Sequence, residues 1–288
     1  VGHLLGGHAE GLLDDLDWMF TAFRHVDRSP LGSASGFGVA LPLDRQRVSD
    51  LLHFSALQEN TLAVQNDRGK TEMMVLAAAS AFATDLARLA VDLIFLSTDE
   101  LGCFRLADEV TTGSSIMPQK RNPDVLELIR AGATRVRARQ AEAGSVLAGL
   151  GSGYHRDLQA TKEPLLEGMR TAEEMAVAVV PVLRTLEIDV ERCRDLLGRS
   201  IGATDAVYAR VADGLPFREA YKQVAADPEG SVGESPAQSW RRRDHRGAPA
   251  GLDLPRLETR RQGLAERSDR LRRRIVAAWS LLGASHTL

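Results

Sequence analysis

The sequence contains little cysteine, few aromatic residues and almost no net charge. Only Cys103 and Cys193 occur among 288 residues, which are too few and too far apart for a disulfide framework or a zinc cluster. We therefore expect a reducing, cytoplasmic environment. The formal net charge of −3 creates no general field for attracting nucleic acid, so any anion site must be local.

Long uninterrupted apolar runs are also missing. The most apolar stretch, 75–96, contains Asp85, Arg88 and Asp92, and charges at those places argue against a membrane span. The histidines are scattered without the spacing of metal ligands. We therefore expect a soluble protein that binds neither a membrane nor a metal.

Basic residues gather near the C-terminal end, in the run 241–243 and in the segment 256–274. Acidic residues interleave with them, and aromatic side chains for stacking bases are absent from the cluster. The pattern indicates a solvated helix face, and we expect no nucleic-acid partner.

Apolar residues recur every three or four positions over most of the chain, which is the spacing of amphipathic helices. Long helices are predicted at 1–28, 60–96, 123–150, 157–185 and 254–282, and shorter ones at 44–54, 190–197, 204–212 and 216–224. Strand patterns and internal repeats are not detected. The sequence predicts an all-α fold.

Helices of this length would each span about 40 Å at 1.5 Å per residue. A lone chain of this size would leave much of such rods uncovered, so we expect a homo-oligomeric bundle. We assign 1–186 to a central long-helix bundle domain and 187–288 to a small α-helical C-terminal domain. The stretch 227–250 is rich in Gly, Pro, Ser and Arg and is predicted to be a flexible link.

One segment, 111–124, combines several features of a ligand-binding loop. It reads T-T-G-S-S-I-M-P-Q-K-R-N-P-D, with two adjacent serines after a glycine. Asn122 is predicted to cap the next helix, with Pro123 as its first residue and Asp124 in its first turn. Lys120 and Arg121 then lie beside the positive end of a helix dipole, a place that suits a carboxylate.

This segment resembles the signature of the fumarase/aspartase superfamily, G-S-S-I-M-P-x-K-x-N-P. Its Q-K-R-N-P-D ending, followed by Glu127, is most similar to argininosuccinate lyase. The resemblance implies cleavage of argininosuccinate to arginine and fumarate, in arginine biosynthesis, without a cofactor. It also implies a homotetramer in which each active site gathers segments from three subunits.

The resemblance also implies roles for single residues of the segment. Ser114 would be the general base, and Lys120 and Asn122 would stabilise the dianion formed when the proton leaves. Ser115 would contact the substrate. Glu127 would hold a histidine that assists proton transfer to the departing amine.

A second segment, 154–163, reads Y-H-R-D-L-Q-A-T-K-E and resembles the family's Y-N-R-D-L-Q-x-D-K. The resemblance makes Tyr154, Gln159 and Lys162 substrate-binding residues. The segment departs from the family pattern in having a histidine at 155 and Thr161 where aspartate is usual.

Other segments extend the resemblance along the chain. The stretch 66–70 lies where the family carries a polar segment that lines the site, which makes Asn66 and Arg68 substrate-binding candidates. The stretches 29–33 (S-P-L-G-S) and 202–220 match the family's loop after its first central helix and its C-terminal domain.

The family's assisting histidine lies in a T-H-x-Q segment before the first central helix, and this sequence does not contain that segment. We therefore expect the family's N-terminal part to lie outside this chain. Three functions stay open: an argininosuccinate lyase, a fumarate-releasing lyase with another amine leaving group, and a non-catalytic helical-bundle relative.

Overall fold

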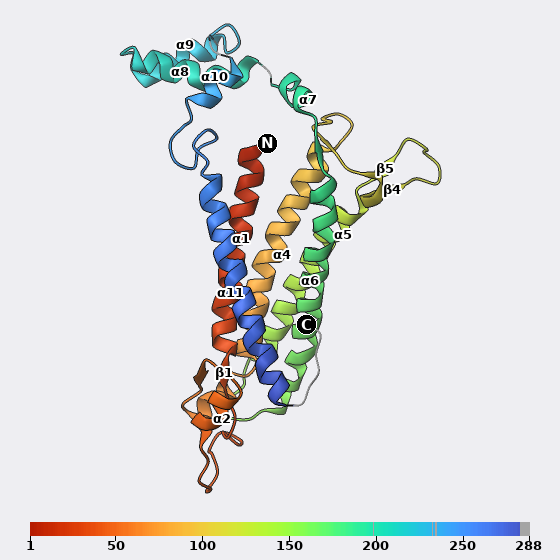
Figure 1. The fold of residues 1–288 in the computed structure, drawn as a ribbon. Helices are drawn as coiled ribbons and strands as arrows, with labels where there is room; N and C mark the ends of the chain where they lie inside the picture. The colour runs from red at the N-terminus through yellow and green to blue at the C-terminus, as the bar shows by residue number, and fades with distance from the viewer. Residues whose placement is uncertain (198, 232, 234, 283–288) are drawn as a thin grey trace.

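The computed structural model describes residues 1–197, 199–231, 233 and 235–282, and nearly all of its regular structure is helical (Figure 1). Five long helices form a bundle, which confirms the predicted all-α fold. They are α1 (Gly2–Val26), α4 (Lys70–Leu96), α5 (Asp124–Val146), α6 (Lys162–Thr185) and α11 (Leu254–Leu281).

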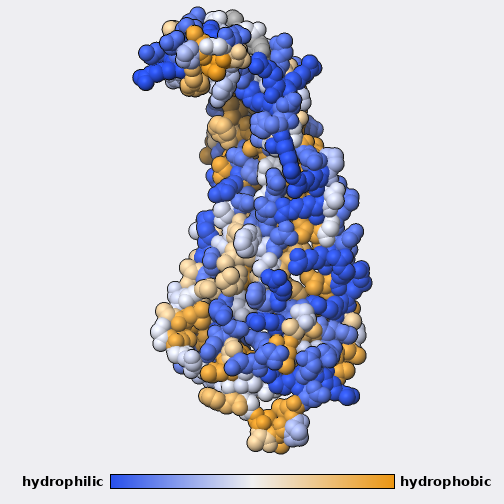
Figure 2. All heavy atoms as spheres, turned by 90° about the vertical axis from the view of Figure 1, so that its left-hand side faces the viewer, coloured by the Kyte–Doolittle hydropathy of each residue, from blue (hydrophilic) through white to orange (hydrophobic). Residues whose placement is uncertain are grey.

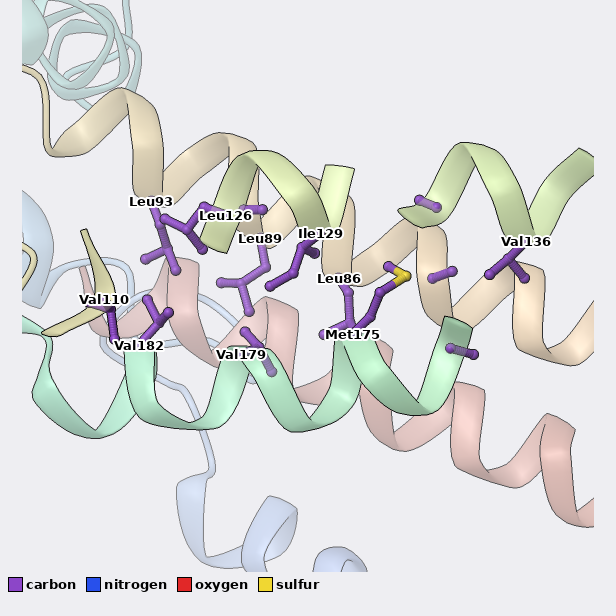
Figure 3. Packing of buried hydrophobic residues seen from close by; sticks show 14 of the residues in the cluster. Leu86, Leu89, Leu93, Val110, Leu126, Ile129, Val136, Met175, Val179 and Val182 are labelled. Atoms are coloured by element: carbon purple, nitrogen blue, oxygen red, sulfur yellow. The ribbon is translucent and has the colours of Figure 1, made fainter. Parts of the chain in front are cut away.

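Helix α4 is the centre of the bundle and packs against α1, α5 and α6. Its residues Leu86, Leu89 and Leu93 meet Ile129 of α5 and Met175 of α6 in the main core (Figure 3). By length and composition α4 could cross a membrane. In this chain α4 packs against three other helices, and 44% of its apolar window is buried among them.

Glycines allow two of these helix pairs to approach closely. A Cβ at Gly168 of α6 would lie 2.4 Å from Cδ2 of Leu76 on α4. A Cβ at Gly132 of α5 would lie 2.8 Å from the sulfur of Met175. The absence of side chains at these two positions therefore sets the spacing of α5, α6 and α4.

The predicted single helix over 60–96 is wrong, because the segment forms α3 (Thr61–Asn66) and then α4. The break falls at Gly69, whose φ of 76° is left-handed. A Cβ there would also lie 2.3 Å from Cδ2 of Leu147. Glycine is therefore needed both for the left-handed backbone and for the close packing against Leu147. Asn60 caps α3 by accepting hydrogen bonds from two backbone N–H groups.

The helix predicted at 157–185 also begins differently. Its first turn is the 3-10 helix η2 (Arg156–Thr161), and α6 follows directly. Helix α5 ends at Val146, earlier than the predicted 150. The structure thereby places residues 147–155 in a connecting loop at one end of the bundle.

Short elements close that same end of the bundle. Strand β1 (Arg28–Ser29) pairs in parallel with β2 (Ala56–Leu57), and α2 (Arg45–Leu51) lies between them in the chain. Asp44 caps α2 as predicted, accepting a 2.8 Å hydrogen bond from the N–H of Arg47. Pairs of two residues are too short to show the alternation by which strands are recognised in a sequence.

A helical arm lies beyond the opposite end of the bundle (Figure 1). Strand β3 (Phe104–Arg105) pairs with β6 (Glu187–Ile188) where the arm begins. The arm then comprises α7 (Val190–Asp195), η3 (Arg199–Gly202), α8 (Ala203–Ala212), α9 (Phe217–Ala226) and α10 (Pro236–Arg241). Val207, Ala220 and Val224 form a small core of its own between α8 and α9.

Two features bear on the predicted domains 1–186 and 187–288. Helix α10 lies inside the predicted link 227–250, so that part is not loop, because Ser235 and Gln238 form a capping box. Helix α11 leaves the arm and returns along α1, where Arg260 contacts Asp14 and Asp17 at 2.6 Å each. The flexibility of the link, whose residues 232 and 234 lie outside the described residues, and the domain division itself stay predictions.

Candidate active site

The predicted signature loop is a small hairpin that projects from one end of the bundle (Figure 1). Strand β4 (Thr112–Gly113) pairs antiparallel with β5 (Arg121–Asn122), between the 3-10 helix η1 (Asp108–Val110) and α5. Arg121 Nε donates to Asp108 Oδ1 at 3.0 Å and ties the hairpin to η1.

Ser114 lies just after β4 and is half-buried, whereas Ser115 is exposed. The Ser114 Oγ accepts hydrogen bonds from the backbone N–H groups of Ile116, at 3.2 Å, and Met117, at 3.1 Å. Two N–H dipoles aimed at one oxygen favour its negatively charged form. The turn therefore directs two backbone N–H groups at the Ser114 hydroxyl oxygen.

The predicted helix cap is displaced by one residue. Asn122 belongs to β5 and pairs with Thr112, and its Nδ2 donates to the carbonyl of Gly113 at 3.4 Å. Because this pairing keeps Asn122 within the hairpin, the N-cap falls at Pro123 and α5 begins at Asp124. The carboxylate of Asp124 accepts a hydrogen bond from the Thr112 hydroxyl, so it anchors the hairpin to the helix.

Lys120 and Glu127 are both exposed, on the hairpin and on the first turn of α5. The backbone N–H of Lys120 donates to Met117 O at 3.1 Å, which closes the turn around Ser114. Glu127 Oε1 lies 3.7 Å from Nη2 of Arg130, one turn further along α5. Both charges remain accessible from outside the chain.

The second group of predicted site residues lies at the opposite end of the bundle. Asn66 accepts a 2.9 Å hydrogen bond from the N–H of Gly153, which links the end of α3 to the 147–155 loop. The guanidinium of Arg68 lies 5.0 Å from the centre of the Tyr154 ring, a cation–π contact, and Tyr154 is 50% exposed.

Gln159 and Lys162 are exposed at the junction of η2 and α6, while Thr161 between them is fully buried. The Thr161 hydroxyl lies 3.4 Å from Glu72 Oε1, and Glu72 Oε2 accepts a 2.7 Å hydrogen bond from the N–H of Gly69. Glu72 thus connects the 66–70 segment to the 154–163 segment. Sequence reasoning missed this residue, although its position three residues after the helix-breaking glycine is a capping signal.

A cavity of about 1460 Å³ adjoins this second group. Its polar lining includes Arg68, Glu72 and Tyr154, and its apolar lining comes from α1, α6 and α11, including Phe20, Leu166 and Leu271. In the part of the chain that the structure describes, three or more His, Cys, Asp or Glu side chains are nowhere grouped to hold a metal ion.

The two groups of predicted residues do not meet within one chain. Helix α4 begins beside the second group and ends near the signature hairpin, and its 27 residues span about 40 Å. Figure 1 shows β4 and β5 at one end of the bundle and β1 and α2 at the other. A substrate the size of an amino acid could not touch both groups in a single chain.

Comparisons with known proteins show which proteins this chain resembles in sequence. The profile of a family described as "Lyase" matches residues 1–138. The argininosuccinate lyase of Sorangium cellulosum is 43% identical over 260 residues, which cover 90% of this chain and 60% of that protein. The argininosuccinate lyase of Stenotrophomonas maltophilia is 38% identical, covering 92% of this chain and 62% of the relative.

Solved structures share the fold at lower sequence identity. An EDDS lyase in complex with formate matches with a TM-score of 0.78 and 24% identity, covering 97% of this chain and 65% of the other. A class II fumarase from Schistosoma mansoni matches with a TM-score of 0.60 and 17% identity, covering 88% and 59% of the two chains. The chain spans about 60% of the length of the curated relatives described above. With its signature segment and its helical bundle, the chain is similar to the argininosuccinate lyases over about 90% of its own length, and residues 1–138 match the lyase family.

Proposed function

We propose that this chain carries the central part of an argininosuccinate lyase, which cleaves argininosuccinate to arginine and fumarate. The observation that supports the proposal most is the Ser114 hydroxyl held between two backbone N–H groups in a loop with the superfamily's signature. The relatives that match over 90% of the chain carry this activity in their names. The proposal concerns the assembled protein, because the chain spans only part of those relatives.

In the proposed reaction, Ser114 takes the proton from the carbon next to a substrate carboxylate. The electron pair left on that carbon forms the double bond of fumarate, the C–N bond breaks, and the amine leaves with a proton. Lys120, Asn122 and the N–H groups of the hairpin stabilise the dianion as it forms. Glu127 orients the histidine that protonates the amine.

We also propose that copies of the chain combine their ends into one site, in a cytoplasmic homotetramer. The second group of residues, Asn66, Arg68, Tyr154, Gln159 and Lys162, would then bind the substrate beside another copy's hairpin. Large apolar side chains on the bundle surface support such packing: Leu128 is 71% exposed, Leu166 69% and Val177 66%. Figure 2 likewise shows hydrophobic patches between the charged ones along one side of the bundle.

The test is fumarate release from argininosuccinate, followed by ultraviolet absorbance. The chain is assayed alone and with a separately made segment that carries a T-H-x-Q motif. Because the loss of the general base removes a contribution of about 10²-fold or more, Ser114→Ala should lower the turnover by at least that factor. The matched control Ser145→Ala, on the exposed side of α5, should keep full turnover with unchanged helicity.

Three outcomes would contradict parts of this account. Near-normal turnover of Ser114→Ala would remove this serine from the mechanism. Fumarate release from other N-substituted aspartates but not from argininosuccinate would favour the lyase with another leaving group. If no substrate released fumarate, with or without the added segment, the result would favour the non-catalytic relative.

A further inference from the structure

The only two cysteines of the sequence, 90 positions apart, come together where the arm leaves the bundle. The β3–β6 pair joins Phe104 to Ile188, and the next hydrogen bond of the ladder runs from Asp189 N to Cys103 O at 2.9 Å. Cys103 is therefore fixed opposite Asp189, the N-cap of α7. The contact lies at the hairpin end of the bundle.

Cys193 stands one helical turn beyond Asp189. Its N–H donates to Asp189 O at 3.0 Å, which fixes the Cys193 backbone in the first turns of α7. The Cys193 sulfur lies 4.0 Å from the carbonyl oxygen of Cys103. Cys103 is 5% exposed and Cys193 is half-buried, and both are free thiols.

The thiols also influence each other. Burial raises the pKa of the Cys193 thiol above its ordinary value, and the contacts with Cys103 raise it further. The carboxylate of Asp189 adds to this effect, although Arg105 pairs with it at 3.1 Å. Because Cys103 and Cys193 lie in backbone elements that are hydrogen-bonded to each other, and the Cys193 sulfur contacts the Cys103 carbonyl, the two side chains need little movement to reach disulfide geometry.

We propose that Cys103 and Cys193 form an oxidisable dithiol, a modification site that reacts with small disulfides such as oxidised glutathione to form an intrachain disulfide. This site lies apart from the residues of the proposed elimination. Two protein thiols become one disulfide bond, and the S–S bond of the small disulfide becomes two thiols. The oxidant is thus reduced by the two electrons that the protein loses.

The exposure of the thiols sets the order of the two steps. The more accessible Cys193 attacks the small disulfide as a thiolate, which releases one thiol and leaves a mixed disulfide. The Cys103 thiolate then attacks the Cys193 sulfur and releases the second small thiol. Because few thiolates exist at neutral pH when the thiol pKa is raised, the reaction should be slow at pH 7 and faster at pH 9.

The disulfide would join the 97–105 segment, which follows α4, to α7 at the base of the arm. It would hold the arm in one orientation beside the signature hairpin. By closing a long loop it would also restrict the unfolded chain. Oxidation is therefore expected to raise the melting temperature by roughly 5–15 °C, and reduction to reverse the shift.

The chain is incubated with oxidised glutathione at pH 7 and pH 9 and analysed by non-reducing peptide mapping and thermal denaturation. We expect a cross-linked peptide pair containing Cys103 and Cys193, a mass lower by two hydrogens, and the raised melting temperature. Cys193→Ser should show neither the cross-link nor the shift. Cys103→Ser should stop at the glutathione adduct on Cys193.

Two results would overturn the proposal. One is a wild-type chain that keeps both thiols free or carries only glutathione adducts at pH 9. The other is cross-linking between chains instead of within one chain. Peptide mapping and thermal denaturation do not require catalysis. The dithiol proposal can therefore fail while the proposed lyase function stands, and the lyase function can fail while the dithiol proposal stands.

Discussion

Asp15 is a carboxyl group on the buried face of α1, with 4% of its surface exposed. Its Oδ2 has no hydrogen-bond partner in the part of the chain that the structure describes. Burial, then the neighbouring charges of Asp85 and Asp14, raise the pKa of Asp15 from 3.8 to about 6. At neutral pH this buried group is charged and destabilises the fold.

The sign of the pH dependence follows from the raised pKa. The stability contributed by protonated Asp15 is complete below pH 3.8 and is lost as pH rises through about 6. We expect Asp15→Asn, which cannot ionise, to increase the free energy of unfolding at pH 8 by up to about 3 kcal/mol. The gain should shrink to a fraction of that at pH 4.5.

Urea denaturation of both proteins at the two pH values measures this difference. The exposed Asp99→Asn is the matched control and should change stability little at either pH. A gain for Asp15→Asn that is equal at both pH values would show that Asp15 titrates normally in the folded state.

The sequence predicts those site residues whose surroundings are local. The motif marked Ser114 as a site residue, and the two N–H groups whose hydrogen bonds it accepts lie within four residues of the same segment. The link through Glu72 and the Cys103–Cys193 contact were not predicted, because each joins segments about 90 residues apart. Such contacts depend on how helices pack, which single-chain periodicity does not encode.

At the scale of elements, the close helix contacts rest on particular glycines. Gly168 lies within α6, where a Cβ would be 2.4 Å from Leu76 Cδ2 and 3.3 Å from Arg139 Cβ. Gly263 lies within α11, and among the described residues no atom comes within 4 Å of its would-be Cβ. Both glycines lie inside a helix, but only Gly168 is packed closely against other residues.

We expect opposite effects from the same substitution at these two sites. Gly168→Ala should lower the free energy of unfolding by about 1–3 kcal/mol, because the helices must separate. Gly263→Ala should raise it by about 0.5–1 kcal/mol, because alanine loses less backbone entropy in a helix. Urea denaturation of both variants measures the difference, and a stabilising Gly168→Ala would contradict the packing described.

The long helices were predictable, whereas the short strands and several helix boundaries were not. The apolar spacing continues through residues 60–96, so the periodicity gave no sign of the break between α3 and α4. The break depends on the left-handed backbone at Gly69 and on its contact with Leu147, which comes from α5's distant end. The helix start at 157 likewise became 3-10, as the buried Thr161 bonds to the carbonyl of Leu158.

At the scale of the whole molecule, the bundle leaves apolar side chains on its surface and separates the two groups of site residues. Val177 of α6 is 66% exposed, and Leu128 of α5 is 71% exposed. Covering such side chains with copies of the same chain would remove them from water and bring opposite ends of different copies together.

We expect light scattering to show a tetramer of the 31.3 kDa chain. Val177→Glu, which places a charge on the exposed face of α6, should shift the population toward smaller species while helicity stays unchanged. The matched control Leu41→Glu, at a 68% exposed position in the loop before α2, should leave the assembly intact. A stable monomer of the unmodified chain would refute the bundle assembly.

The most direct test of a site shared between chains is a distance measured between two copies. One population carries a spin label at Ile116→Cys in the signature hairpin, and another at Leu166→Cys beside the second group, both with the native cysteines replaced by serine. Both positions are exposed, at 86% and 69%. In co-assembled chains the account predicts a label distance well below the roughly 40 Å length of α4. The account would be contradicted if every measured distance were roughly 40 Å or longer, or if the two labels showed no coupling.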